Sequence, residues 1–260
     1  MLSLSVQMPQ LQLLLFIFLR VDAIFMFLPI FNSRAIPILF KFGFAMAVAI
    51  VLFPLLSGQV RPLFGTIPEL ALAAACELMI GILIGLAVRT LFAGFQMAGQ
   101  MAGYQMGMAI ANVMDPATSA QVPILATFYN LIAILVFLSI NAHLFMLRAM
   151  VESFQLVPLF GFGFNQDIMQ HIIRLAGNMF IVALKIGAPV IVALLITSAA
   201  LGLVARTIPQ MNIFIVAMPL KIAIGLIFLG MSLPYMGDFL SRTFATMGQS
   251  VLLLMRTMGT

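Results

Sequence analysis

Five ionisable residues interrupt otherwise apolar runs of this 260-residue sequence: Arg20, Asp22, Glu77, Lys185 and Lys221. Each such residue costs about 2.5–3.5 kcal/mol at the centre of a membrane helix on insertion scales. Groups of this kind either relay protons or ions, or find partners on other helices or subunits. They are therefore the first candidates for chemistry in this chain.

These five residues fall into two groups by their position in the predicted spans. Arg20 and Asp22 are two positions apart, so they point to different faces of a helix and cannot simply satisfy each other. We expect Arg20, Asp22 and Glu77 to be buried in protein or to line water. Lys185 and Lys221 lie within a few turns of a span boundary, where snorkelling of the ammonium group to the interface is the alternative.

Enzymatic and metal chemistry have little support in the sequence. His143 lies near Arg148 and Glu152, but no Ser or Cys nucleophile stands in a recognisable catalytic frame. The single cysteine, Cys76, excludes an internal disulfide or a thiolate cluster, and the second histidine, His171, is far from the first. We predict no catalytic residue, no metal and no cofactor.

The composition excludes an ordinary soluble domain. The sequence is 64% hydrophobic and only 7% charged, with a mean hydropathy of +1.22. A soluble domain of this size would expose one continuous apolar patch, so the chain is expected to be an integral membrane protein. Its twelve Lys and Arg residues are scattered singly, which argues against nucleic-acid binding.

Runs of about 20 mainly apolar residues predict an all-α membrane protein with about six long hydrophobic helices in hairpins. The tail, residues 237–260, is compatible with a helix that lies on the interface or re-enters an assembly. The N-terminus shows no pattern of a removable signal peptide. Lysine and arginine counts in the loops do not decide the orientation. The six predicted spans are residues 11–31, 42–56, 70–92, 124–147, 176–204 and 213–236.

The stretch between the third and fourth spans, residues 94–123, differs from its surroundings. Gly99, Gly103 and Gly107 recur every four residues, which on a helix gives a strip where another backbone can approach closely. Asp115 and Pro116 are expected to stop that helix. Flexible or uncharged polar side chains surround the strip: Met97, Met101, Met106, Met108, Met114, Gln96, Gln100 and Gln105.

Two interpretations of this stretch remain open. One is a helix-packing seam followed by a loop. The other is a pliable constriction, in which small residues allow close approach and methionines form a seal that deforms at little cost. Along its whole length the stretch is too polar to face lipid.

Several motifs follow one another along the chain. They are Arg20 with Pro29, residues 34–37 (RAIP), Lys41 and Gly43; Glu77 with Gly81 and Gly85; Gly103 with residues 105–107 (QMG), 115–116 (DP) and Pro123; Asn141 with His143; and residues 200–203 (ALGL) with Arg206, Pro209, Gln210, residues 212–214 (NIF) and Pro219. As an ordered set they resemble the FliR family of flagellar type III export-gate proteins and their injectisome relatives. One departure is Ala142, where the family has glycine in an Asn-Gly-His-Leu pattern.

This resemblance implies a core subunit of the flagellar protein export gate, present in one copy. The gate is a helical hetero-oligomer with several copies of two other membrane proteins, of P and Q type. It encloses a closed pore through which unfolded flagellar proteins leave the cytoplasm. The implied partners are those subunits, an adjacent B-type switch protein, unfolded export substrates and membrane lipids. The implied location is the flagellar basal body in the bacterial inner membrane.

The resemblance also implies a division of the chain and a set of site residues. Residues 1–166 would be a P-like part, with a central plug loop at about 103–123, and residues 167–260 a Q-like helical hairpin with a tail. Implied plug residues are Gly103, Gln105, Met106, Gly107, Met108, Met114, Asp115 and Pro116. Implied residues of a loop at the cytoplasmic entrance are Arg206, Pro209, Gln210, Asn212 and Phe214.

The alternative function is a six-span small-molecule or ion transporter. In that case Asp22, Glu77 and Lys185 would form a proton or ion relay. Such a transporter is expected to show internal repeats with matched broken helices, and the sequence has none in corresponding halves.

Overall fold

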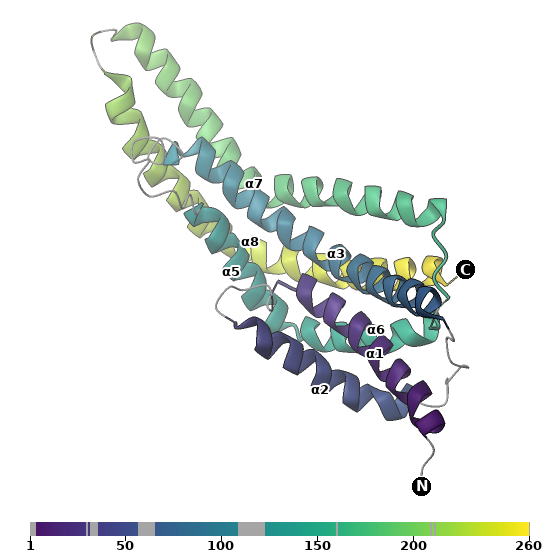
Figure 1. Ribbon diagram of the computed structural model, residues 1–260. Helices are drawn as coiled ribbons and strands as arrows, with labels where there is room; N and C mark the ends of the chain where they lie inside the picture. Colours follow the sequence, from purple (N-terminus) through teal and green to yellow (C-terminus); the bar gives the residue numbers. More distant parts are fainter. Residues whose placement is uncertain are drawn as a thin grey trace. The chain divides into compact units, whose positions relative to one another are not determined.

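The computed structural model describes residues 4–29, 31, 36–56, 66–108, 123–159, 161–208, 210 and 212–259, and this part of the chain contains helices and no strand. The all-α fold class is confirmed (Figure 1). The helices are α1 (Leu4–Phe27), α2 (Ile38–Leu56), α3 (Ile67–Gln105), α5 (Ile124–Ser139), α6 (Ala142–Leu156), α7 (Gln166–Thr207) and α8 (Ile213–Met258).

The helices build two compact units from discontinuous segments. Unit 1 contains Met1–Thr90, Asn141–Leu175 and Ala245–Thr260, and unit 2 contains Leu91–Ile140 and Ala176–Phe244. Helices α3, α7 and α8 each contribute to both units. The predicted division at residue 166 concerned a likeness to other subunits, which these units do not test, and it stays a prediction.

In unit 1, α1 and α3 run parallel and pack closely. A Cβ atom added at Gly81 would lie 2.6 Å from the Ala23 Cβ and 2.7 Å from the Arg20 carbonyl oxygen. One turn later, a Cβ at Gly85 would meet the Cβ of Phe27. These glycines therefore let the two helix backbones approach as a small-residue pair does in membrane proteins. Helix α2 packs on the same α1.

The start of α7 and the end of α8 are joined within unit 1 by one side chain. The Oδ1 atom of Asn165 accepts the N–H of Ile168 at 3.0 Å, which caps the first turn of α7. Its Nδ2 atom donates to the Thr257 carbonyl oxygen at 3.0 Å, near the end of α8. One amide thus satisfies two backbone groups that the helix ends would otherwise leave unpaired.

In unit 2, four phenylalanines from three helices form the aromatic centre. Phe92 and Phe95 of α3, Phe137 of α5 and Phe244 of α8 contact one another with ring centroids 5.3–5.8 Å apart. Tilted and edge-on aromatic pairs of this kind add to the stability that burial alone provides.

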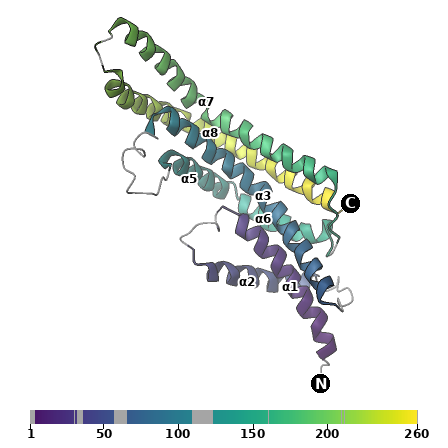
Figure 2. The ribbon, with the colours of Figure 1, turned by 45° about the horizontal axis from the view of Figure 1, so that its top comes forward.

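The end of α7 and the start of α8 form a hairpin that both views show side by side (Figure 1 and Figure 2).

The predicted spans match the helices in place but not always in extent. By length and composition, five helices could cross a membrane, or six if α5 and α6 count as one bent span. The third predicted span and the start of the glycine-rich stretch, as far as Gln105, form one continuous α3, and the predicted separate tail continues α8. The fourth predicted span was wrong as a single helix, because the chain breaks at Ile140 and Asn141.

Helices α7 and α8 are the two longest of the described helices, and both are far longer than a bilayer requires. Helix α7 has 42 residues and α8 has 46, which at 1.5 Å per residue gives lengths of about 63 and 69 Å. The hydrocarbon core of a bilayer is about 30 Å thick. Apolar surface on these helices therefore extends beyond what one crossing can cover with lipid.

The break between α5 and α6 depends on one residue. Asn141 has φ 56° and ψ 27°, the left-handed conformation, and is the one non-glycine residue with positive φ in the described part of the chain. Asparagine tolerates this conformation better than most residues because its short side chain bonds locally. The break is thus encoded at Asn141, and Ala142 can follow it as an ordinary helical residue.

We expect Asn141→Gly to leave the protein as stable as the wild type and Asn141→Val to destabilise it by about 1–2 kcal/mol, because a branched side chain is strained at this φ. The measurement is the temperature at which the protein, purified in mild detergent, loses its monodisperse peak. Leu131→Val, at an exposed helical position of α5, is the control. If the Asn141→Val protein lost its monodisperse peak at the same temperature as this control, the left-handed residue would not fix the break.

Candidate functional site

Arg20 is the most unusual side chain of the described structure, since it is fully buried at 0% exposure in an apolar helix. Its Nε donates to Oε2 of Glu77, also fully buried, at 2.6 Å, and the two form an ion pair between α1 and α3. The close α1–α3 packing at Gly81, one turn after Glu77, brings the two side chains within reach. All of these residues belong to unit 1.

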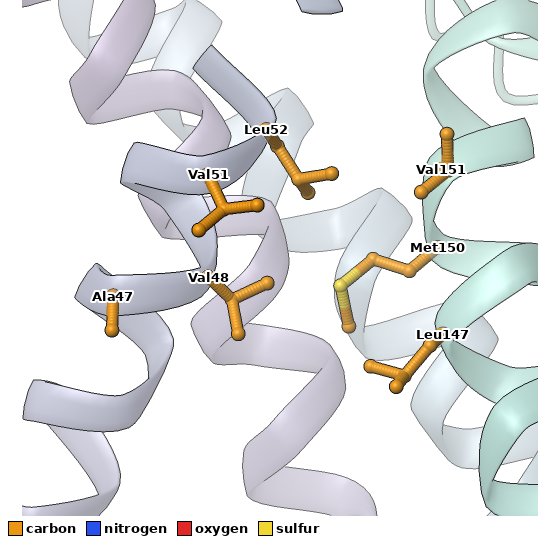
Figure 3. A pocket seen from close by; sticks show the side chains of 7 residues that line it. All are labelled: Ala47, Val48, Val51, Leu52, Leu147, Met150 and Val151. Atoms are coloured by element: carbon orange, nitrogen blue, oxygen red, sulfur yellow. The ribbon is translucent and has the colours of Figure 1, made fainter. Parts of the chain in front are cut away.

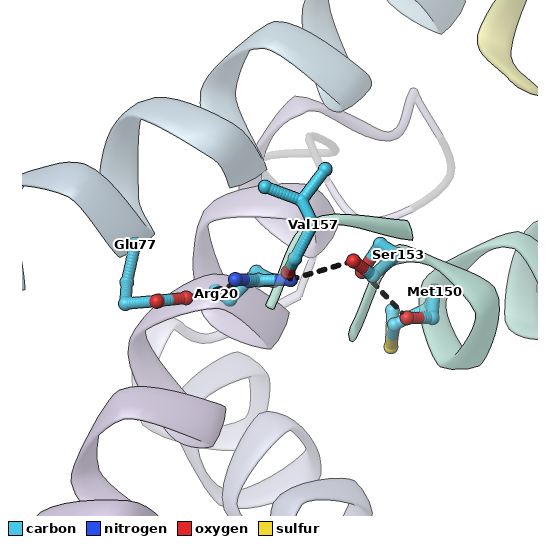
Figure 4. Close-up of polar contacts among 5 residues, drawn as sticks. All are labelled: Arg20, Glu77, Met150, Ser153 and Val157. Atoms are coloured by element: carbon cyan, nitrogen blue, oxygen red, sulfur yellow. Dashed lines mark hydrogen bonds and ion pairs between the residues drawn. The ribbon is translucent and has the colours of Figure 1, made fainter. Parts of the chain in front are cut away.

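The same guanidinium also holds the end of α6. Its Nη1 donates to the carbonyl oxygens of Ser153 at 2.9 Å and Val157 at 3.0 Å (Figure 4). Its Cζ lies 4.3 Å from the centre of the Phe154 ring. The Ser153 carbonyl also accepts the N–H of Val157 at 2.9 Å, so Arg20 adds a second hydrogen bond there, and the partial negative charge at a helix C-terminus favours a cation. Arg20 thus links three helices of one unit.

This geometry suits a fixed structural lock. A guanidinium is not deprotonated in proteins, so Arg20 cannot pass a proton to Glu77 and take it back. Directional hydrogen bonds from two of its nitrogens fix the side chain on both sides. Taking one partner away from a buried ion pair leaves an uncompensated charge, which is why such pairs hold their elements in place.

The other predicted intramembrane charges differ from this pair in their exposure. Asp22 is half-buried on α1, and its Oδ1 has no hydrogen-bond partner among the described residues. Lys185 on α7 is exposed and Lys221 on α8 is half-buried.

The central stretch is described as far as Met108, and α3 ends at Gln105, earlier than the predicted stop at Asp115. The reason is Gly107, whose φ of 79° is the left-handed conformation in which helices commonly terminate. Gly107 therefore lies outside the helix and does not extend the predicted glycine strip. The predicted plug residues Met114, Asp115 and Pro116 lie outside the described residues.

Within unit 2, the glycines and methionines of this stretch differ in their surroundings. A Cβ at Gly99 would lie 2.6 Å from both the Ala126 Cα and the Leu125 carbonyl oxygen, so α3 meets the backbone of α5 there. Gly103 has only ordinary contacts. Met106 is fully buried, whereas Gln105 and Met108 are half-buried.

The predicted entrance loop connects α7 to α8. Arg206, Gln210 and Asn212 are exposed, and the Asn212 carbonyl accepts the N–H of Ile215 at 3.2 Å as α8 begins. Pro209 lies outside the described residues, and of the Phe214 side chain nothing is described. The described residues form a short exposed turn between two long helices.

The two remaining features offer little for catalysis or for binding a polar substrate. His143 is half-buried near the start of α6, while Arg148 and Glu152 are exposed on the same helix. A cavity of about 310 Å³ in unit 1 is lined by Ala47, Val48, Val51, Leu52, Leu147, Met150 and Val151 (Figure 3). These side chains are apolar, so they offer no hydrogen bond to a charged solute.

Sequence reasoning found Arg20 and Glu77 but missed the acceptors on α6. Ser153 and Val157 act through backbone carbonyls, which every residue type provides, so no sequence signal marks them. Phe154 is one of 24 phenylalanines, and nothing local singles it out. Gly225 of α8, which contacts Met106, was likewise not among the predicted residues.

Comparison with known proteins gives a consistent result along most of the sequence. A family model described as "Bacterial export proteins, family 1" matches residues 11–247. The flagellar biosynthetic protein FliR of Bacillus subtilis is 37% identical over 221 residues, covering 83% of each chain. The FliR proteins of Pectobacterium carotovorum and Escherichia coli are 32% and 31% identical, with 86–88% of each chain covered.

We expect Glu77→Gln to destabilise the protein by about 3–5 kcal/mol, because Arg20 would remain buried without its counter-charge. Less monodisperse protein should be recovered from detergent extracts, and it should melt at a lower temperature. Glu69→Gln, at an exposed position of the same helix, is the matched control. Replacing both partners, Arg20→Met with Glu77→Leu, should recover part of the loss. A Glu77→Gln protein as stable as the control would contradict the lock.

Proposed function

This chain belongs to the bacterial export proteins of family 1, and we propose on that basis that it is a core subunit of the flagellar protein export gate. The observation that carries the proposal is the match of residues 11–247 to the family, together with identities of 31–37% to FliR proteins over more than four-fifths of each chain. The several long apolar helices make it a membrane-embedded component.

The physical features of the chain support a role in an assembly. Helices α7 and α8 carry exposed large apolar side chains along much of their length, including Ile196, Leu203, Ile215 and Met231. Both helices exceed the thickness of a bilayer core about twofold. Apolar surface outside lipid must be covered by protein, which favours neighbouring subunits as the covering partner.

The finer part of the proposal names those neighbours and the location. The subunit joins P-type and Q-type membrane proteins and the adjacent B-type switch protein in the bacterial inner membrane, at the flagellar basal body. The pore that they enclose passes unfolded flagellar proteins. The loop of Arg206, Gln210 and Asn212 faces the cytoplasm, in keeping with the preference of arginine for that side. The subunit catalyses no reaction itself.

The central stretch is proposed as the plug of that pore, from Gly103 through Met108 to Met114, Asp115 and Pro116. Methionine side chains repack at little cost, which suits a seal that must block ions and still yield to a polypeptide. The proposed role of Arg20 and Glu77 is to hold the helices of this subunit in the shape that its neighbours bind. Asp22, Lys185 and Lys221 are proposed to contact those neighbours, since the described structure leaves them partly or fully accessible.

If the chain is an export-gate subunit, it should restore swimming to a Bacillus subtilis strain that lacks its own FliR. Affinity purification of the tagged chain in mild detergent should then bring down the P-type and Q-type subunits of that strain. The Glu77→Gln variant, expected to fold poorly, is the negative control, and Glu69→Gln is the positive one. A chain that restores no motility and brings down neither subunit would contradict the proposal.

The proposed orientation is tested at Gln210, an exposed residue of the α7–α8 turn. A Gln210→Cys variant in a Cys76→Ala background should react with a membrane-impermeant thiol reagent only when the cytoplasmic side is accessible, as in inverted vesicles. Its reaction in intact spheroplasts should match that of the Cys76→Ala parent. Labelling of Gln210→Cys in intact spheroplasts would show that the loop faces the opposite side.

A further inference from the structure

The side chain of Met106 packs in an unusual way in unit 2. It is fully buried, and its side chain lies directly on the backbone of Gly225 in α8. A Cβ added at Gly225 would overlap the Met106 side chain, with Cγ at 2.8 Å and Sδ at 2.9 Å. The glycine therefore provides the space that the methionine fills, and we call this contact the Met106 seat.

The Met106 seat lies where α3 ends. The N–H of Met106 still donates to the Ala102 carbonyl oxygen at 3.0 Å, and the N–H of Gly107 donates to the Tyr104 carbonyl oxygen at 3.0 Å. Gly107 then turns the chain with φ 79°, and a Cβ there would approach Met218 of α8 at 4.0 Å. Met218 and Gly225 are seven residues apart, about two turns, and so share one face of α8. That face receives the end of α3.

A second contact holds α3 two turns earlier, and it differs in kind. At Gly99 the obstructing atoms belong to the backbone of α5, which cannot move without displacing a helix. At Gly225 they belong to a methionine side chain, which has three rotatable bonds and repacks at low cost. Of the two contacts, the Met106 seat is the one that can open while the helices stay in place.

We propose that Met106 is a positioning residue whose side chain, seated on Gly225, holds the end of α3 on α8 and thereby keeps the gate closed. This inference rests on the proposed gate function and deepens it. It assigns to Met106 an anchoring role at the base of the proposed plug, and it identifies Gly225 as its receptor. The described residues that begin the plug, from Gly103 to Met108, keep their place only while the seat is filled.

The test uses two opposite changes at the seat and one control. Met106→Ala empties the seat, and Gly225→Val fills it from the α8 side and expels the methionine. Gly230→Val is the control, because a Cβ at Gly230, on the same helix, meets nothing within 4 Å. Each variant is made with all gate subunits, and two quantities are measured: complex recovered by affinity purification, and entry of a small impermeant solute into the cells.

We expect Met106→Ala to give a normal yield of complex and a several-fold rise in solute entry over wild type. Cells with the Gly225→Val variant should take up at least as much solute, whereas cells with Gly230→Val should take up no more than wild type. Combining Met106→Ala with Gly225→Val should reduce the leak of either single variant, since valine then occupies the volume that the methionine left. Such mutual rescue is not expected at Gly99, where the obstruction is backbone.

Three results would overturn the inference. One is a Met106→Ala complex that assembles and is as tight as wild type. The second is a Met106→Ala complex that fails to assemble, because the contact would then be ordinary packing. The third is a double variant that leaks as much as the worse single variant. Failure of the gate function itself is recognised separately, since the wild-type chain would then neither restore motility nor recover the other subunits.

Discussion

The burial of one guanidinium connects three helices of unit 1. Arg20 carries a full charge in a place from which solvent is excluded, and the cost of its desolvation must be offset by fixed partners. Glu77 provides the opposite charge, the carbonyls of Ser153 and Val157 accept two further hydrogen bonds, and the Phe154 ring lies against the cation. Because these partners come from α3 and from the end of α6, helix α1 cannot shift without leaving a charge unpaired.

Close helix packing makes that arrangement possible, and it uses glycine in two distinct ways. At Gly81 and Gly99 the absence of a side chain lets helix backbones meet, as small residues do in membrane proteins, where lipid gives no hydrophobic drive for association. At Gly225 the same absence makes room for the side chain of Met106. The first kind is a contact between backbones, and the second is a contact with a side chain that can repack.

The lengths and surfaces of the helices connect this local order to the family. A chain with an 18-residue apolar window in each of five helices is suited to a membrane. Yet α8, at 46 residues, has only 17% of its most apolar window buried within the chain. Lipid can cover an apolar window of this length, so the exposure alone does not separate a transporter from an export subunit, and the match to the export family makes that distinction.

The sequence by itself determined the class of protein, the approximate position of the helices, the family and the need of Arg20 and Glu77 for partners. These are encoded in composition, in apolar run length and in the type of individual residues. The motifs that carry the family resemblance also include Gly81 and Gly85.

Only the tertiary structure decided which partners those charges take. The contacts of Arg20 span 57, 133 and 137 residues of sequence, and two of them go to backbone carbonyls. Every residue type has such a carbonyl, so the sequence does not mark these two acceptors. The break at Asn141 and the early end of α3, just before the left-handed Gly107, were also missed, since a left-handed residue inside an apolar run does not change its hydropathy. The seat of Met106 depends on a glycine more than a hundred residues away, brought there by packing alone.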